Sequence, residues 1–270
     1  MIKRTLTGAV ITVFVYVWLF FSHIPLVLHI GTLALGILAV FEILRICKTD
    51  KPKNCYYVMT VSVLLLILPI PQYEYVMMLL ILPVALFLFG LMMVGKEQIK
   101  EFNFKFATVV SIVAVLLFKS VPTLRNLGNG FYYLTFAVTA CFVTDVAALL
   151  FGKAFGSRRL CPKISPKKTV EGAVGGVICT VLVAAIASVL LDKYEILRFD
   201  TTSLIIWSVL VSVVGQFGDL CMSVVKRIAG VKDFGNLLPG HGGILDRFDS
   251  HMFAVAFTLV FCATTGGFIL

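Results

Sequence analysis

Apolar runs long enough to cross a lipid bilayer follow one another along almost the whole chain. A hydrocarbon core about 30 Å thick is crossed by a helix of about 20 apolar residues. Nine candidate spans fit this length, at residues 6–22, 25–45, 56–71, 75–95, 106–122, 130–151, 171–191, 203–224 and 252–269. The sequence therefore predicts an all-α fold, a polytopic bundle of about nine transmembrane helices. A re-entrant hairpin around Pro69 and Pro71 is the alternative for two of them.

The composition excludes most other classes of protein. With 60% hydrophobic and 14% charged residues, the chain has too much apolar surface for a soluble domain. No polar gap is long enough for a soluble module, so residues 1–270 are predicted to form a single membrane domain. The seven cysteines are scattered without a CxxC pair, which favours neither a disulfide framework nor a zinc site.

The distribution of basic residues predicts the topology. A cytoplasmic N-terminus places nineteen of the 23 Lys and Arg residues inside, and only Lys119, Arg125, Lys193 and Arg198 outside. The net charge of +9 is thus explained by membrane orientation, and no nucleic-acid partner is expected. The first apolar run lacks a small-residue cleavage site, which favours a retained helix over a signal peptide.

The two halves of the chain differ in polar character. Spans within residues 1–125 contain few polar residues beyond Glu42, so we expect them to be scaffold, lipid-facing or dimer-forming helices. Residues 126–270 hold Asp145 and Asp219 within apolar runs, and a polar loop at 152–169. Because an ionisable group costs about 2.5–3.5 kcal/mol at such depth, it normally faces a protein interior or a water-filled cavity. We therefore expect residues 126–270 to carry the chemistry.

The densest polar segment, Ser223 to Asp249, connects the last two predicted spans. Asp219, Ser223 and Lys226 follow an i, i+4, i+7 pattern, which places them on one face of a helix. Asp246 and Asp249 are spaced i, i+3, so two carboxylates come within reach of one hard cation. The hypothesis is that Asp219, Asp246 and Asp249 hold one or two Mg²⁺ ions.

Glycines and cations in the same segment are suited to phosphate binding. Gly242 and Gly243 end a Pro-Gly-His-Gly-Gly turn, where backbone amides can approach phosphate oxygens closely. Cationic side chains that could neutralise a polyphosphate or lipid phosphate lie around it: Lys226, Arg227, Lys232 and Arg247. A basic loop that only orients the membrane protein is the plain alternative, but it does not require the carboxylates and glycines.

A second polar block, Ser165 to Glu171, precedes the seventh span. Ser165 and Thr169 offer hydroxyls, Lys167 and Lys168 offer cationic donors, and Glu171 could organise them. A helix-capping box with two topology-determining lysines is the structural alternative, and both interpretations are compatible.

Together these blocks resemble the signature of the phosphatidate cytidylyltransferase family. The elements that carry the resemblance are Ser223-x-x-Lys226-Arg227, Lys232-Asp233, Pro239-Gly240-His241-Gly242-Gly243 and Asp246-Arg247-x-Asp249. Upstream, the matching positions are Asp145, Gly152, Phe155-Gly156, Leu160, Pro162 and the run from Ser165 to Gly172. The resemblance covers roughly residues 141–250, and Val170 departs from it by replacing an aromatic residue.

The resemblance implies a reaction of CTP with phosphatidic acid that yields CDP-diacylglycerol and pyrophosphate. The expected catalytic residues are Asp219, Lys226, Asp246 and Asp249, with Mg²⁺ on the three aspartates. The expected substrate-binding residues are Ser165, Lys167, Lys168, Thr169, Glu171, Ser223, Arg227, Lys232, His241, Gly242, Gly243 and Arg247. The expected setting is a bacterial inner membrane, with the site facing the cytoplasm and a homodimer formed through the early spans. A CTP-dependent lipid kinase and an ion-coupled transporter are the alternatives.

Overall fold

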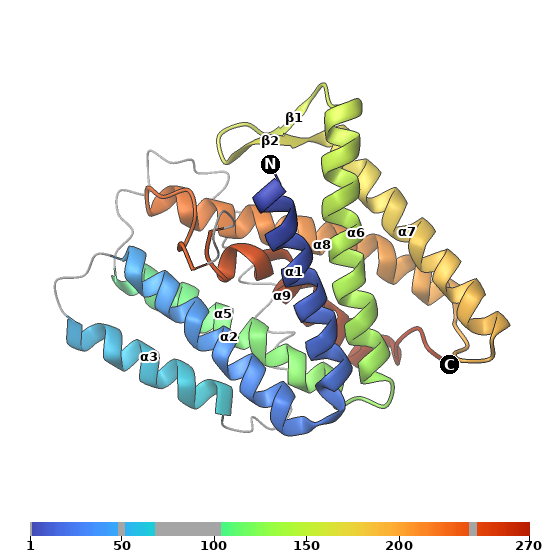
Figure 1. Ribbon diagram of the computed structural model, residues 1–270, viewed down its shortest axis with the longest axis horizontal. Coiled ribbons are helices and arrows are strands. Elements are labelled where there is room, and N and C mark those ends of the chain that lie inside the picture. Colours follow the sequence, from blue (N-terminus) through green and yellow to red (C-terminus); the bar gives the residue numbers. More distant parts are fainter. Residues whose placement is uncertain (1, 48–51, 68–103, 238–241) are drawn as a thin grey trace.

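The computed structural model describes residues 2–47, 52–67, 104–237 and 242–270, and this part of the chain is mainly helical (Figure 1). It contains α1 (Ile2–Phe20), α2 (Pro25–Ile46), α3 (Pro52–Ile67), α5 (Phe104–Arg125), α6 (Gly130–Ala154), α7 (Val170–Lys193), α8 (Thr201–Ile228) and α9 (Leu245–Thr265). A short 3-10 helix, Phe21–His23, joins α1 to α2. The predicted α-helical membrane protein is confirmed.

Six of these helices, α2 and α5 to α9, are long and apolar enough to cross a membrane. Shorter apolar helical stretches occur at Val10–His23 and Cys55–Ile67, where the first and third spans were expected. The fourth predicted span, at 75–95, and the alternative hairpin at Pro69 and Pro71 lie outside the described residues. Nine spans therefore stay a prediction.

The last predicted span was placed wrongly by several residues at both ends. We expected residues 252–269, whereas α9 begins at Leu245 and ends at Thr265. Hydropathy fails at the start because the helix continues through the charged residues that a hydropathy count avoids. At the other end Gly266 adopts a left-handed conformation, with φ of 80°, which terminates the helix. Asp246 and Asp249 consequently lie inside the first turns of α9.

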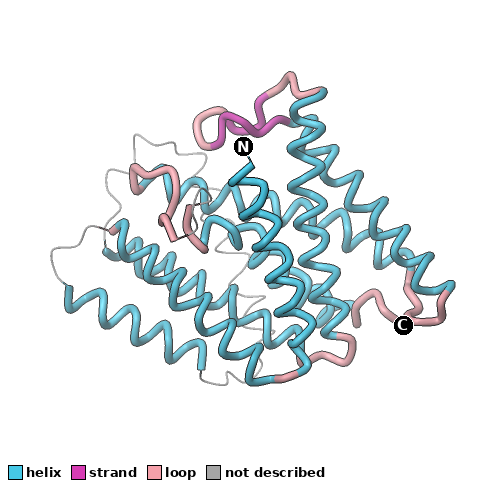
Figure 2. Tube along the Cα trace, viewed as in Figure 1, coloured by secondary structure: helices cyan, strands magenta, loops and turns pink. Residues whose placement is uncertain are grey.

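α9 is the most buried of the six described helices that are long and apolar enough to cross a membrane. Figure 2 shows the helices packed side by side, with the short strands at one end of the bundle. α9 contacts α8 on one side and α5 on another, and α6 also packs against it. The longest interface joins α6 to α7, which in turn packs on α8. Since α5 also packs against α2, α9 is held between the N-terminal helices and the α6–α8 group.

The polar loop before α7 forms a small antiparallel hairpin that the sequence analysis did not predict. Strand β1 (Arg159–Cys161) pairs with β2 (Ser165–Thr169), with Arg159 opposite Thr169 and Cys161 opposite Ser165. Pro166 is tolerated in β2 because each strand of a two-stranded ribbon has one unpaired edge. The hairpin leads directly into α7, so it fixes where that helix begins.

Candidate active site

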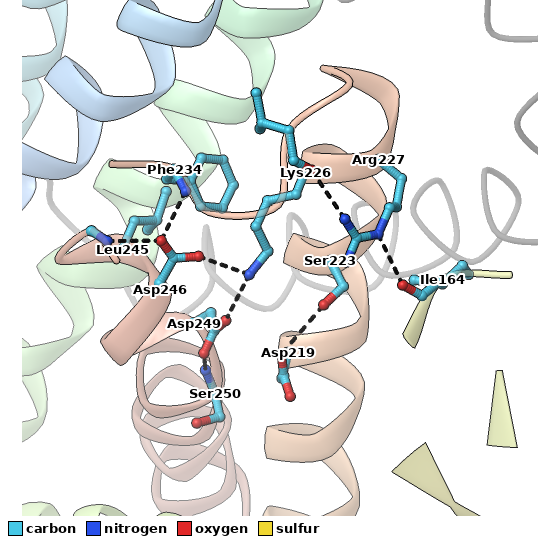
Figure 3. A network of polar contacts seen from close by, with 12 residues as sticks. Ile164, Asp219, Ser223, Lys226, Arg227, Phe234, Leu245, Asp246, Asp249 and Ser250 are labelled. Atoms are coloured by element: carbon cyan, nitrogen blue, oxygen red, sulfur yellow. Dashed lines mark hydrogen bonds and ion pairs between the residues drawn. The ribbon is translucent and has the colours of Figure 1, made fainter. Parts of the chain in front are cut away.

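Lys226 of α8 lies between two carboxylates of α9 (Figure 3). Its Nζ is 2.9 Å from Oδ1 of Asp246 and 3.7 Å from Oδ2 of Asp249. All three side chains are almost entirely buried, and the ammonium also lies 5.4 Å from the centre of the Phe234 ring. A buried charge is tolerated only when it is paired, so this cluster fixes α8 and α9 against each other.

Asp246 also organises the loop that precedes α9. Its Oδ2 accepts hydrogen bonds from the backbone N–H groups of Phe234, at 2.8 Å, and Gly243, at 2.9 Å. Gly242 has a φ of 85°, and a β-carbon there would come 2.9 Å from Oδ2 of Asp246. The glycine pair therefore allows the backbone to fold closely around this carboxylate.

Asp219 forms the second ion pair of the site, with Lys168 from β2. The Lys168 Nζ lies 2.5 Å from Oδ2 of Asp219, and both side chains keep 27% of their surface exposed. Ser223, one turn further along α8, approaches Oδ1 of Asp219 at 3.5 Å. The i, i+4 and i+7 residues of α8 thus share a face, as the spacing indicated, and the Ser165–Glu171 block meets this face at Asp219.

Thr169 and Glu171 act at the junction of the hairpin with α7. Thr169 caps the helix, because its Oγ1 accepts a hydrogen bond from the N–H of Gly172 at 3.1 Å. Glu171 accepts hydrogen bonds from Ser157 Oγ at 2.5 Å and from the N–H of Arg158 at 3.1 Å. The capping function predicted as the structural alternative is therefore present for Thr169, whereas Glu171 holds the approach to the hairpin.

Thr169 is surrounded by three glycines. β-Carbons built on Gly152, Gly156 and Gly172 would each come 2.9 Å from its Oγ1. Side chains at these positions would displace the cap, so the glycines leave room for the threonine.

Arg227 ties the hairpin to the end of α8. Its Nε donates to the carbonyl oxygen of Ile164 and its Nη1 to that of Val231, both at 3.1 Å. Of the other predicted substrate-binding residues, Lys167 and Lys232 are exposed and Ser165 is partly exposed. Arg247 is half-buried, and its Nε has no hydrogen-bond partner among the described residues. His241 lies outside the described residues.

Two carboxylates that the predicted site omitted also belong here. Asp145 of α6 receives a hydrogen bond from Ser250 of α9, with 3.4 Å between Oγ and Oδ2. Its charged neighbours include Asp219 and Lys168. Glu42 of α2 accepts hydrogen bonds from the N–H groups that open α9. Each is an isolated carboxylate in an apolar span, which was the available sequence signal.

The donor set is suited to a hard divalent cation. Asp145, Asp219, Asp246 and Asp249 offer only oxygen ligands, which Mg²⁺ prefers. Against these four formal negative charges stand Lys168, Lys226 and Arg247, which leaves the cluster one charge negative. Among the described residues, no three acidic, histidine or cysteine side chains are already arranged as a ligand set. Lys168 and Lys226 pair with three of the four carboxylates, those of Asp219, Asp246 and Asp249.

The three aspartates predicted as ligands differ in how fully their oxygens are used. Asp246 already accepts three hydrogen bonds from the chain. Asp249 accepts one, from the N–H of Ser250 at 2.9 Å, and has the more distant contact with Lys226. Asp219 is partly exposed. Asp219 and Asp249 therefore keep more free oxygen capacity for a cation than Asp246 does.

Similarity to known proteins extends over nearly the whole chain. The model of the cytidylyltransferase family matches residues 2–265. The phosphatidate cytidylyltransferase of Bacillus subtilis strain 168 is 34% identical over 262 residues, which cover 94% of this chain and 95% of that protein. The enzyme of the same name from Staphylococcus saprophyticus is 46% identical over 127 residues, 47% of each chain, and that from Staphylococcus aureus strain COL is 42% identical over 132 residues. The chain belongs to the cytidylyltransferase family.

Proposed function

We propose that this protein transfers CMP from CTP to phosphatidic acid and forms CDP-diacylglycerol and pyrophosphate, a step of phospholipid biosynthesis. The observation that carries the proposal is the pair of lysine–aspartate clusters, Lys226 of α8 with Asp246 and Asp249 of α9, and Lys168 of β2 with Asp219 of α8. Both α8 and α9 are long and apolar enough to span a membrane. Family membership along nearly the whole chain supports it.

The reaction brings two anions together. An oxygen of the phosphatidate phosphate forms a bond to the α-phosphorus of CTP, and the bond from that phosphorus to the bridging oxygen breaks. Pyrophosphate leaves with the electron pair. Catalysis of such a displacement depends mainly on positioning and on stabilising negative charge.

Lys168 and Lys226 are the cations that the proposal places against phosphate oxygens. Each is held by a carboxylate before substrate arrives, so each ammonium is oriented without being free in solution. Ser223 beside Asp219 would donate a hydroxyl to the same region. The residues proposed to complete substrate binding are Ser165, Lys167, Thr169, Glu171, Arg227, Lys232, His241, Gly242, Gly243 and Arg247.

We further propose that Asp219, Asp246 and Asp249 hold one or two Mg²⁺ ions. Bound there, Mg²⁺ would offset the charge of the triphosphate and of the leaving pyrophosphate. The chain's own contribution is to hold the three carboxylates on facing turns of α8 and α9.

The membrane arrangement in the proposal follows the distribution of basic residues. The chain crosses a bacterial inner membrane nine times from a cytoplasmic N-terminus, with the site facing the cytoplasm, where CTP is found. Phosphatidic acid enters from the inner leaflet. Self-association as a homodimer through the early helices is part of the same proposal.

The position of a radioactive label tests the reaction. Purified protein is incubated with phosphatidic acid, Mg²⁺ and CTP labelled at either the α- or the γ-phosphorus. CMP transfer moves the α-label alone into the lipid phase, as CDP-diacylglycerol. A γ-label in the lipid would instead identify a CTP-dependent lipid kinase. If neither label reaches the lipid, and proteoliposomes show ion-coupled flux, the protein is a transporter.

A further inference from the structure

Glu42 connects the N-terminal helices to the candidate active site. Its side chain is 1% exposed, and its two oxygens accept hydrogen bonds from the backbone N–H groups of Ile244, at 2.8 Å, and Leu245, at 2.9 Å. These residues lie 202 and 203 positions away along the chain. The contact is therefore a long-range one between α2 and the start of α9.

This contact supplies a cap that α9 does not provide for itself. The first N–H groups of a helix have no partner within the helix and are usually satisfied by a nearby Ser, Thr, Asp or Asn side chain. The residue at the N-cap of α9 is Ile244, which cannot serve in this way. A carboxylate at a helix N-terminus is also favoured by the helix dipole. Glu42 thus replaces the missing local cap.

The loop before α9 is shaped to fit the Glu42 side chain. A β-carbon on Gly243 would come 2.5 Å from both Glu42 oxygens, and one on Gly235 would come 2.7 Å from Oε1. The N–H of Gly243 points to Asp246, and the next two N–H groups point to Glu42. One short stretch of backbone is therefore held by two carboxylates from different helices.

We propose that Glu42 is a positioning residue for the transfer reaction. By fixing the first turn of α9, it holds Asp246 and Asp249 opposite Lys226, although it touches none of the reacting groups. α2 otherwise approaches α9 at few points, so this contact is the main link between them among the described residues. The expected effect on kcat rests on the proposed function, whereas the expected effect on the backbone at the start of α9 can be measured without it.

The test compares Glu42→Gln with Thr32→Val. Glutamine keeps the shape of the side chain but has one acceptor oxygen in place of two. Its NH₂ group, a donor, then faces one of the backbone N–H groups of Ile244 and Leu245, which is also a donor. Thr32 lies on the same helix and is 3% exposed, and its hydroxyl donates a hydrogen bond to the Leu28 carbonyl of its own helix. The readouts are kcat and KM for CTP and phosphatidic acid, and hydrogen–deuterium exchange at the amides of residues 242–247.

We expect Glu42→Gln to lower kcat at least about tenfold, consistent with the loss of a charge-assisted hydrogen bond. Exchange at residues 242–247 should become faster, while Thr32→Val keeps wild-type exchange and kcat. Wild-type kcat and exchange in Glu42→Gln would overturn the proposal, and so would equal losses in Thr32→Val. If wild-type protein makes no CDP-diacylglycerol but exchange still rises in Glu42→Gln, the proposed function fails and the structural role stands.

A second variant, Gly243→Ala, perturbs the same contact from the loop side. Because it leaves Glu42 in place, its exchange and kcat test the proposal even if Glu42→Gln does not fold. Gly243→Ala inserts a β-carbon against the Glu42 oxygens. It should reproduce the faster exchange and lower kcat, and it should cost less in a Glu42→Ala background, because the colliding atoms are then gone. Additive effects of the two substitutions would contradict the proposed contact.

Discussion

Replacement of Lys226 by methionine tests two roles of this lysine, the stabilisation of the buried aspartates and the proposed contact with phosphate. Methionine is apolar and similar in length, so it removes the charge without opening a large cavity. Asp246 and Asp249 then lose their shared cation while the side chain of Asp246 is 2% exposed and that of Asp249 is 9% exposed. Breaking a buried ion pair from one side costs about 3–5 kcal/mol. At roughly 2–4 °C per kcal/mol, the melting temperature should fall by about 6–20 °C.

The double variant Lys226→Met/Asp246→Asn tests the source of that loss. The asparagine oxygen can take the place of Oδ2 and keep the N–H groups of Phe234 and Gly243, while its amide nitrogen replaces the oxygen that faced Lys226. One of the two uncompensated charges is gone while that of Asp249 remains, so we expect a partial recovery of the melting temperature. Activity should not recover, because the ammonium proposed to contact phosphate is still missing.

The measurements are thermal unfolding in detergent and CDP-diacylglycerol formation from labelled CTP. Lys163→Met is the control, because Lys163 is an exposed lysine of the hairpin loop. We expect Lys226→Met to lower activity at least about a hundredfold, the scale seen when one transition-state donor is removed. A double variant no more stable than Lys226→Met would refute the electrostatic reasoning. Activity above a tenth of wild type would refute the catalytic role.

Two further predictions concern the cation and the core of the bundle. Chelation with EDTA should abolish CDP-diacylglycerol formation, and added Mg²⁺ should restore it. Asp219→Asn should need more Mg²⁺ for half-maximal activity than wild type or the control Asp192→Asn, whose side chain is exposed. An unchanged Mg²⁺ requirement in Asp219→Asn would exclude Asp219 as a ligand. Thr144→Val removes buried hydrogen bonds of 2.7 Å to Thr180 and 2.9 Å to Ser212, which should cost about 1–3 kcal/mol and lower the melting temperature by about 2–12 °C. The exposed Thr60→Val should leave that temperature unchanged, and an equal melting temperature for Thr144→Val would show that these bonds add no stability.

Local patterns of sequence predicted the parts of the site that lie on single helices. The i, i+4, i+7 spacing placed Asp219, Ser223 and Lys226 together because helix geometry is the same in every helix. The i, i+3 spacing did so for Asp246 and Asp249, although hydropathy placed the start of their helix wrongly. Charged residues lower the mean hydropathy of a segment, so a hydropathy count leaves them out of a span. The helical backbone can nevertheless continue through them where its first N–H groups have hydrogen-bond acceptors.

Contacts between distant segments were not predictable in the same way. The pairing of Lys168 with Asp219 and the capping of α9 by Glu42 depend on how whole helices pack. Periodicity describes one helix at a time and does not determine which faces meet. The hairpin was missed for a different reason, since β2 is a short strand that contains a proline and two lysines.

The threonine cap at the start of α7 links the identities of four positions in the chain. Thr169 fills the space that Gly152, Gly156 and Gly172 leave empty. Serine at 169 would keep the capping oxygen but lose the methyl group that lies 2.7 Å from a β-carbon on Gly156, and valine would keep the bulk but lose the cap. β-Carbons on Gly156 and Gly172 would also meet backbone oxygens, the first that of Gly152 and the second, at 2.6 Å, that of Ala148, so glycine should persist there whatever stands at 169. At position 152, by contrast, a larger residue in related chains should accompany loss of the threonine oxygen at 169.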